Sequence, residues 1–184
     1  MKAPFTMHCF VFGMAFLPAF LLGNSPNTDG PPPVILPIIE LSDQFGNPYR
    51  YEAPLAKPLF LTSANNRGSK LTSPWINQFY AEFGSTIEII GIADLRGAPR
   101  VMHPALKLLF REQCPDYPIL LDWKGKITSL LARSRSGLDV FVISPEGAIV
   151  AAAEGEHTSD KAKPLQEHLR GFLQAKQGEG EAAP

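Results

Sequence analysis

The chain has 184 residues, which is room for one domain with short appendages. Hydrophobic residues make up 45% of it and charged residues 19%, which excludes a largely disordered protein. The formal net charge is -1 and the sequence has no run of Lys or Arg, so it lacks the electrostatic signature of a protein that binds nucleic acid or anionic lipid.

The N-terminus has the pattern of a secretory signal peptide. Lys2 supplies a short positive start, residues 9–23 form an uncharged apolar run, and small residues follow at Gly23 and Ser25. The alternative is an uncleaved anchor, but Pro18 interrupts the run, which is shorter than the roughly 20 residues that a spanning helix needs. We expect residues 1–23 to be cleaved, leaving a periplasmic or secreted protein without a membrane span.

Two segments flank the expected domain at 38–176. Residues 24–37 hold five prolines, including the triplet at 31–33, and predict a semi-rigid linker. Residues 177–184 contain no apolar side chain larger than Ala, and we expect them to be a disordered tail.

Between these segments, strand and helix patterns alternate. Strands are predicted at 38–41 and 49–51 around a turn at 43–47, then at 59–62, 87–92, 119–121, 140–144 and 148–152. Helices are predicted at 75–83, 102–110, 127–131 and 165–173. Ser73 is the expected N-cap of the first helix, Gly84 its stop, and Pro164 is expected in the first turn of the last helix.

This order predicts an α/β fold. Parallel strands joined through helices form a sheet that is covered on both faces, and the hairpin around 145–147 adds antiparallel edge strands. We therefore expect a central mixed sheet with helices on both faces and an N-terminal strand pair.

Two local segments carry a resemblance to a known family. They are YPILLD at 117–122 with Gly125-Lys126-Ile127 after it, and VFVISPEGAIV at 140–150, with Pro-Glu-Gly at the bend. In this order, the chain from about 37 to 173 resembles the thioredoxin-like superfamily, in particular its alkyl hydroperoxide reductase/thiol-specific antioxidant and periplasmic thiol-disulfide branches. The resemblance implies a thioredoxin-like fold.

The resemblance also locates the family's active-site position. A Cys-x-x-Cys opens the first helix of thioredoxins, with a proline five positions after the second cysteine; here Pro74 stands five after Ser69. The position is therefore Asn66, Arg67, Gly68 and Ser69, without a cysteine, and the peroxidatic pattern of Thr or Ser two residues before a cysteine is missing too. The family's cis-proline is also missing, since Gly137-Leu138-Asp139 stands in its place.

These losses predict a domain without redox activity. Disulfide exchange and peroxide reduction both need a thiolate, which asparagine and serine cannot replace. Ser69 has no evident neighbouring base, so it is not expected to be a nucleophile either. The sequence leans against an enzyme and towards a binding or interaction module, with no cofactor.

A polar patch is expected where the strands end. It would gather Asn65 and the degenerate motif with Asp94 and Arg96 from the next strand, and Ser136 and Asp139 from a third loop. Free backbone N–H groups at the helix start, with Arg67 beside them, would suit an anionic group or an extended segment of a partner protein. The alternative interpretation is a cluster of solvated loops.

Cys114 would be the only cysteine of the mature chain, because Cys9 leaves with the signal peptide. It is either a buried small side chain or a reactive thiol, and we expect burial. The alternative function is a single-cysteine reductase or peroxidase that uses Cys114. His103, His157 and His168 are far apart in the sequence, so no metal site is expected.

Overall fold

The computed structural model describes residues 33–115, 117–133 and 136–181. The predicted signal peptide and most of the proline-rich linker lie outside this range, as does the end of the predicted tail. Among the described residues no helix is both long enough and apolar enough to cross a membrane.

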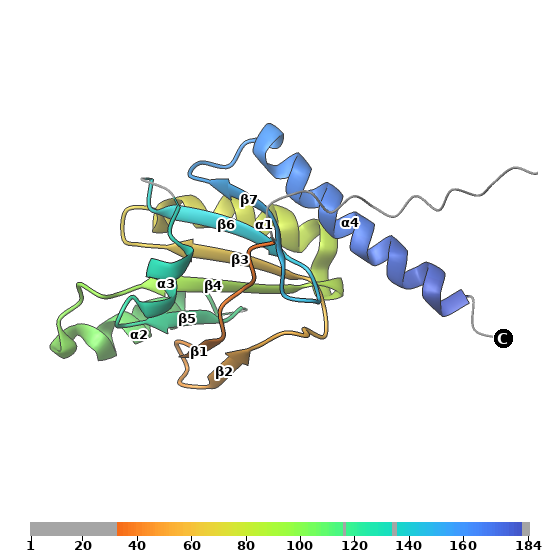
Figure 1. Cartoon of the computed structure of the whole chain (residues 1–184). Coiled ribbons are helices and arrows are strands. Elements are labelled where there is room, and N and C mark those ends of the chain that lie inside the picture. The colour runs from red at the N-terminus through yellow and green to blue at the C-terminus, as the bar shows by residue number, and fades with distance from the viewer. Residues whose placement is uncertain (1–32, 116, 134–135, 182–184) are drawn as a thin grey trace, which may run out of the picture. The chain divides into compact units, whose positions relative to one another are not determined.

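A mixed five-stranded sheet forms the centre of the domain, with strands in the order β5-β4-β3-β6-β7 (Figure 1). Strands β3, β4 and β5 are parallel, and β6 and β7 are antiparallel to their neighbours. A separate antiparallel pair, β1 and β2, precedes the sheet in the sequence. The bounds are β1 Ile39–Ser42, β2 Pro48–Tyr51, β3 Leu59–Ala64, β4 Glu88–Asp94, β5 Ile119–Asp122, β6 Leu138–Ile143 and β7 Ile149–Glu154.

Helices cover both faces of this sheet. The α-helices among the described residues are α1 Thr72–Phe83, α2 His103–Gln113, α3 Lys126–Leu131 and α4 Ser159–Glu181, and the short 3-10 helices there are η1 Ser69–Leu71, η2 Gly84–Thr86 and η3 Arg100–Met102. The α/β class, the mixed sheet and the N-terminal strand pair are therefore confirmed.

The alternation of side chains along the strands explains the two cores. Leu59 and Leu61 of β3 pack in a cluster with α3 and β1, whereas Phe60 between them packs with α1 and α4. The ring of Phe60 stacks on Phe79 of α1 at 4.0 Å between centroids. Every residue of β3 is buried, as expected for a central strand covered on both sides.

Four details differ from the sequence-based expectations. Helix α1 begins at Thr72 with Leu71 at its N-cap, so Ser73 makes no cap, whereas Gly84 does end the helix, with φ +50°. Pro164 lies inside α4 instead of its first turn, because Ser159 and Asp160 start the helix earlier. Strands β6 and β7 were both expected at the edge of the sheet, but β6 lies between β3 and β7, and only β7 is an edge strand of the two.

The fourth difference concerns the ends of the domain. The linker was expected to reach residue 37, but Leu36 donates its N–H to Gly147 O at 2.8 Å and Val34 O accepts the N–H of Ile149 at 2.8 Å. Leu36 is also buried, so the domain begins before the expected boundary at 38. At the other end, α4 continues to Glu181, past the expected limit at 176.

Candidate functional site

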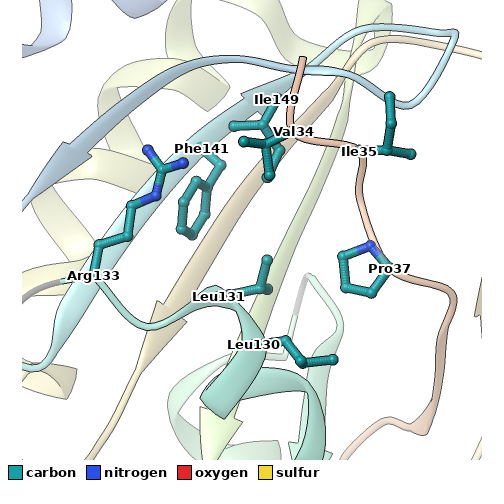
Figure 2. Close-up of a pocket in the computed structure, with 8 residues that line it drawn as sticks. All are labelled: Val34, Ile35, Pro37, Leu130, Leu131, Arg133, Phe141 and Ile149. Atoms are coloured by element: carbon teal, nitrogen blue, oxygen red, sulfur yellow. The ribbon is translucent and has the colours of Figure 1, made fainter. Parts of the chain in front are cut away.

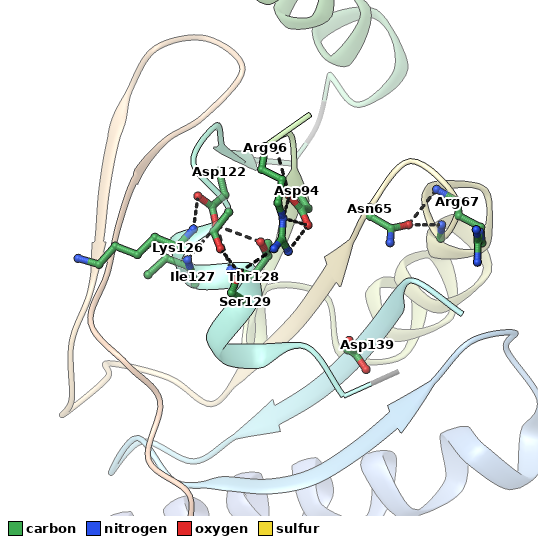
Figure 3. A network of polar contacts seen from close by, with 12 residues as sticks. Asn65, Arg67, Asp94, Arg96, Asp122, Lys126, Ile127, Thr128, Ser129 and Asp139 are labelled. Atoms are coloured by element: carbon green, nitrogen blue, oxygen red, sulfur yellow. Dashed lines mark hydrogen bonds and ion pairs between the residues drawn. The ribbon is translucent and has the colours of Figure 1, made fainter. Parts of the chain in front are cut away.

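The candidate site lies at the edge of the sheet where the parallel strands end. Asp94 pairs in register with Asp122, Ala64 pairs with Ala93, and Asn65 donates its N–H to Gly137 O at 2.9 Å. The ends of β5, β4 and β3 and the start of β6 therefore meet along this edge (Figure 3). Asn65, Asp94, Arg96 and Asp139 therefore lie along one edge of the sheet, and a shared binding role for the whole predicted patch stays a prediction.

The degenerate motif forms a closed turn. Residues 66–68 are a turn and Ser69 begins η1, so α1 starts only at Thr72. The side-chain oxygen of Asn65 accepts the N–H of Arg67 at 2.9 Å and of Gly68 at 3.1 Å, and the carbonyl of Asn65 accepts the N–H of Ser69. The expectation of free N–H groups here is wrong at these three positions, because asparagine satisfies the turn that follows it.

Two glycines bring this turn into backbone contact with the start of β6. A Cβ placed on Gly68 would lie 2.1 Å from the carbonyl oxygen of Gly137, so no other residue fits at position 68 without a shift of the backbone. Gly137 has φ +85°, and a Cβ there would lie 2.2 Å from the side-chain oxygen of Asn65. Proline fixes φ near -65°, so this backbone is incompatible with a proline at 137.

Asp94 and Arg96 satisfy each other. The Arg96 Nε lies 3.0 and 2.9 Å from the two carboxylate oxygens of Asp94, and Nη2 lies 2.6 Å from Oδ2. Arg96 Nη1 also donates to Ser129 Oγ at 2.9 Å (Figure 3). The Arg96 hydrogen bonds lower the pKa of Asp94, so this carboxylate is held charged.

Asp122 is a buried carboxylate that the sequence did not single out as a site residue. It is 1% exposed and accepts the N–H groups of Lys126, Ile127 and Thr128 at 3.1, 2.8 and 2.9 Å. Thr128 Oγ1 donates to it as well, at 3.2 Å. A carboxylate four residues before a helix is the sequence signal that could have identified this cap of α3.

The remaining predicted binding residues are placed as follows. Arg67 is exposed, makes no ion pair within the described part of the chain, and lies apart from Arg96 (Figure 3). Asp139 is buried and accepts the N–H of Arg133 at 3.2 Å. Ser136 Oγ lies 3.4 Å from the carbonyl oxygen of Leu138. A binding role for these residues stays a prediction.

Cys114 lies away from the degenerate motif. Strands β3 and β5 both pair parallel with β4, so they run in the same direction. Cys114 precedes the start of β5 and the motif follows the end of β3, so the two lie at opposite edges of the sheet. The sulfur of Cys114 is 3.2 Å from the hydroxyl oxygen of Tyr117, and the side chain packs in a half-buried position beside Ile119 and Leu121. Burial and the Cys114 contact raise the pKa of Tyr117.

A pocket of about 210 Å³ lies on the α3 face of the sheet (Figure 2). Val34 and Ile35 close it on one side and Leu130 and Leu131 on another, and among the described residues that line it Arg133 is the charged one. The Arg133 guanidinium lies 5.7 Å from the centre of the Phe141 ring, so its charge is already engaged. No cluster of three or more metal-ligating side chains occurs among the described residues.

No protein-family model matches this sequence, and comparison with curated proteins gives no match. Solved structures do match. A protein from Chlorobium tepidum assigned as the thiol:disulfide interchange protein DsbE is 17% identical, with a TM-score of 0.59 over 76% of this chain and 96% of that one. The exposed lipoprotein thioredoxin of Streptococcus pneumoniae is 20% identical, with a TM-score of 0.57 over 71% and 99%.

Peroxidoxin BcpB from Mycobacterium tuberculosis is 21% identical, with a TM-score of 0.54 over 76% of this chain and 96% of that one. The chain therefore has the thioredoxin-like fold that the sequence resemblance implied. The segment between β3 and α1, where the sequence resemblance puts the family's active-site position, contains no cysteine.

Proposed function

We propose that this protein is an exported thioredoxin-like domain that carries out no disulfide or peroxide chemistry and acts by binding. The observation that carries this proposal is the turn at the family's active-site position. It offers no thiol, its N–H groups at 67–69 are taken by Asn65, and Gly68 lies against the backbone of Gly137. A thiol nucleophile, which both disulfide exchange and peroxide reduction need, is missing there.

Cys114 gives no substitute for the lost pair. A reactive thiol needs a nearby cation or a helix N-terminus to favour the thiolate. Cys114 instead follows the C-terminal end of α2, where the helix dipole disfavours an anion, and its sulfur faces the hydroxyl of Tyr117. This geometry supports a structural role for Cys114 over the alternative of a single-cysteine enzyme.

The exported location rests on the signal-like pattern of residues 1–23. One structural neighbour, the exposed lipoprotein thioredoxin, is extracytoplasmic by its name. Mass spectrometry of the protein recovered from the periplasm or medium of a bacterial host tests this part. The expected N-terminus lies just after Gly23, and a chain that keeps Met1 in the cytoplasm would contradict it.

Redox assays test the main claim. We expect the purified protein to reduce insulin disulfides and to consume hydroperoxide, with thioredoxin or small-thiol donors, no faster than the buffer control. The Cys114→Ser variant is the matched control. Turnover that this substitution abolishes would overturn the proposal in favour of a single-cysteine enzyme, and turnover that survives it would overturn the argument that thiols are the only route to activity here.

A further inference from the structure

A wide cleft of about 1000 Å³ separates the β1–β2 pair from the loop between β5 and α3. Leu41 and Tyr49 of the β1–β2 pair, called the N-terminal hairpin below, line one side of the cleft. Trp123 and Ile127 line the other side, so apolar and aromatic surface faces the cleft from both walls. The cleft lies at the same strand ends as Asp94 and Asp122, but beyond β5, at the far side from the closed turn.

Positive charge dominates the rim of this cleft. Its cationic lining residues are Arg50, Lys107, Lys124 and Lys126, and its acidic ones are Glu40 and Asp122. Glu40 already pairs with Arg50, and Asp122 is buried against the N–H groups of α3. The three lysines make no ion pair within the part of the chain that the structure describes. An excess of positive charge is therefore exposed in a chain whose formal net charge is -1.

The walls of the cleft are held in place from outside it. The Trp123 ring stacks on His103 of α2, with 3.7 Å between centroids and 22° between planes. The buried side chain of Gln44, in the turn between β1 and β2, donates to the carbonyls of Cys114 and Tyr117 at 2.8 and 3.0 Å and accepts the N–H of Ile119 at 2.8 Å. These contacts fix the hairpin to the start of β5, so the cleft needs little reorganisation to receive a ligand.

Tyr49 adds a polar group to the hairpin wall. Burial and the carboxylates of Asp43 and Glu88 raise the pKa of Tyr49, so its hydroxyl keeps its proton and can donate a hydrogen bond. The cleft thus combines ring surfaces, a hydroxyl donor and ammonium groups that have no ion-pair partner among the described residues, the usual composition of a site for a small ligand with one charged end.

We infer that this cleft binds a small organic anion, a carboxylate, sulfonate or phosphate carried on a flat apolar or aromatic body. The anionic end would lie among the lysines and the flat body beside Trp123 and Tyr49. This inference rests on the proposed binding function and supplies its site and ligand class. It moves the anion away from Arg67, where the backbone donors are already occupied.

Nuclear magnetic resonance of the nitrogen-15 labelled protein tests this directly, with naphthalene-2-sulfonate as the probe. We expect shifts of the Trp123 indole N–H and of the amides at 124–127. The indole N–H of Trp75, buried and bonded to Gly155 O at 3.0 Å, is an internal reference that should not move. Sulfate alone and the neutral 2-naphthalenemethanol should each bind about tenfold more weakly or worse, because each lacks half of the recognition.

Paired lysine variants locate the anion. Lys124→Gln combined with Lys126→Gln should weaken naphthalene-2-sulfonate about tenfold, and Lys163→Gln, an exposed lysine on α4, should leave it unchanged. Three outcomes would each overturn the inference. The double variant could bind naphthalene-2-sulfonate as tightly as the wild type does, or the neutral alcohol could bind as tightly as the sulfonate. The shifts could also be confined to the exposed apolar residues Val101 and Leu108. Such a result beside inactive redox assays would leave the proposed function standing, whereas redox turnover would overturn that function independently of this titration.

Discussion

Two turns leave the same edge of the sheet two strands apart, one after β3 at Asn65 and one after β5 at Asp122. In each, a side-chain oxygen of the first residue accepts backbone N–H groups. Asn65 accepts those of the turn residues Arg67 and Gly68, and Asp122 accepts those of the first residues of α3. The turn after β3 then packs by its backbone against Gly137 and is closed. The turn after β5 leaves Lys124 and Lys126 exposed beside a cleft.

The two turns occupy equivalent places in the fold but differ in their side chains and contacts. In the turn after β3, Asn65 accepts the N–H groups of Arg67, Gly68 and Ser69. In the turn after β5, the buried Asp122 carboxylate accepts N–H groups of α3, and the two lysines there are exposed, as Arg67 is in the turn after β3. The two turns are therefore alike in having a side-chain acceptor for their N–H groups, and they differ in what their loops contact.

The largest expected effect in this comparison belongs to Asp122. Asp122→Ala would leave three buried or half-buried N–H groups and a hydroxyl without their acceptor, and should lower the free energy of unfolding by about 3 kcal/mol. Urea denaturation measures it, with Asp160→Ala in the exposed first turn of α4 as the control. A loss below about 1 kcal/mol would show that the cap contributes little.

The next effect tests the closed turn. Gly68→Ala would force a Cβ against the backbone of Gly137 and Leu138, at 2.1 and 2.6 Å, and should cost about 2 kcal/mol of stability. Gly97→Ala, in the loop after β4, meets nothing within 4 Å and should be neutral or slightly stabilising. If the two variants unfolded at the same urea concentration, the backbone contact at Gly68 would not be the constraint described here.

The sequence predicted the fold well because its signals are local and periodic. The β-branched run at 87–92 and the helical spacing of Trp75, Phe79 and Phe83 depend only on near neighbours, and both elements form as expected. The turn at 43–47 is another local signal, and Asp43 does accept the N–H groups of Phe45, Gly46 and Asn47.

The candidate site was only partly predictable, because its state depends on long-range contacts. The sequence put Asn66 to Ser69 after the strand at 59–62, but whether their N–H groups are free depends on where α1 starts and on the Asn65 side chain. The contact of Gly68 with Gly137 joins residues far apart in the sequence. The cleft is formed jointly by the N-terminal β1–β2 hairpin, α2 and the loop between β5 and α3. No spacing pattern in the sequence predicts that these three segments lie together.

A smaller effect is expected from Asn65, the counterpart of Asp122 in the closed turn. Asn65→Ala removes the acceptor of two N–H groups that are more exposed than those of α3, and should cost about 1 kcal/mol. Asn65→Asp keeps the acceptor and should restore most of that loss. A loss of stability as large as that of Asp122→Ala would contradict the expectation that the N–H groups bound by Asn65 are less costly to leave without an acceptor than those bound by Asp122.

The smallest effect concerns pH and lies between the two turns, at Asp94. Its pKa is lowered from 3.8 mainly by its hydrogen bonds with Arg96, so the native state binds this proton less readily than the unfolded chain. The resulting stability is fully present above 3.8 and is lost as the pH falls through the lowered pKa. Arg96→Gln should therefore destabilise the protein at neutral pH, and the difference from the wild type should shrink in acid. Urea denaturation across this pH range measures the difference in the free energy of unfolding, and Arg67→Gln is a control that should show no such pH dependence. If the difference between Arg96→Gln and the wild type did not change with pH, the effect of Arg96 would come from its contacts with Ser129 and Gly125 instead of from the charge of Asp94.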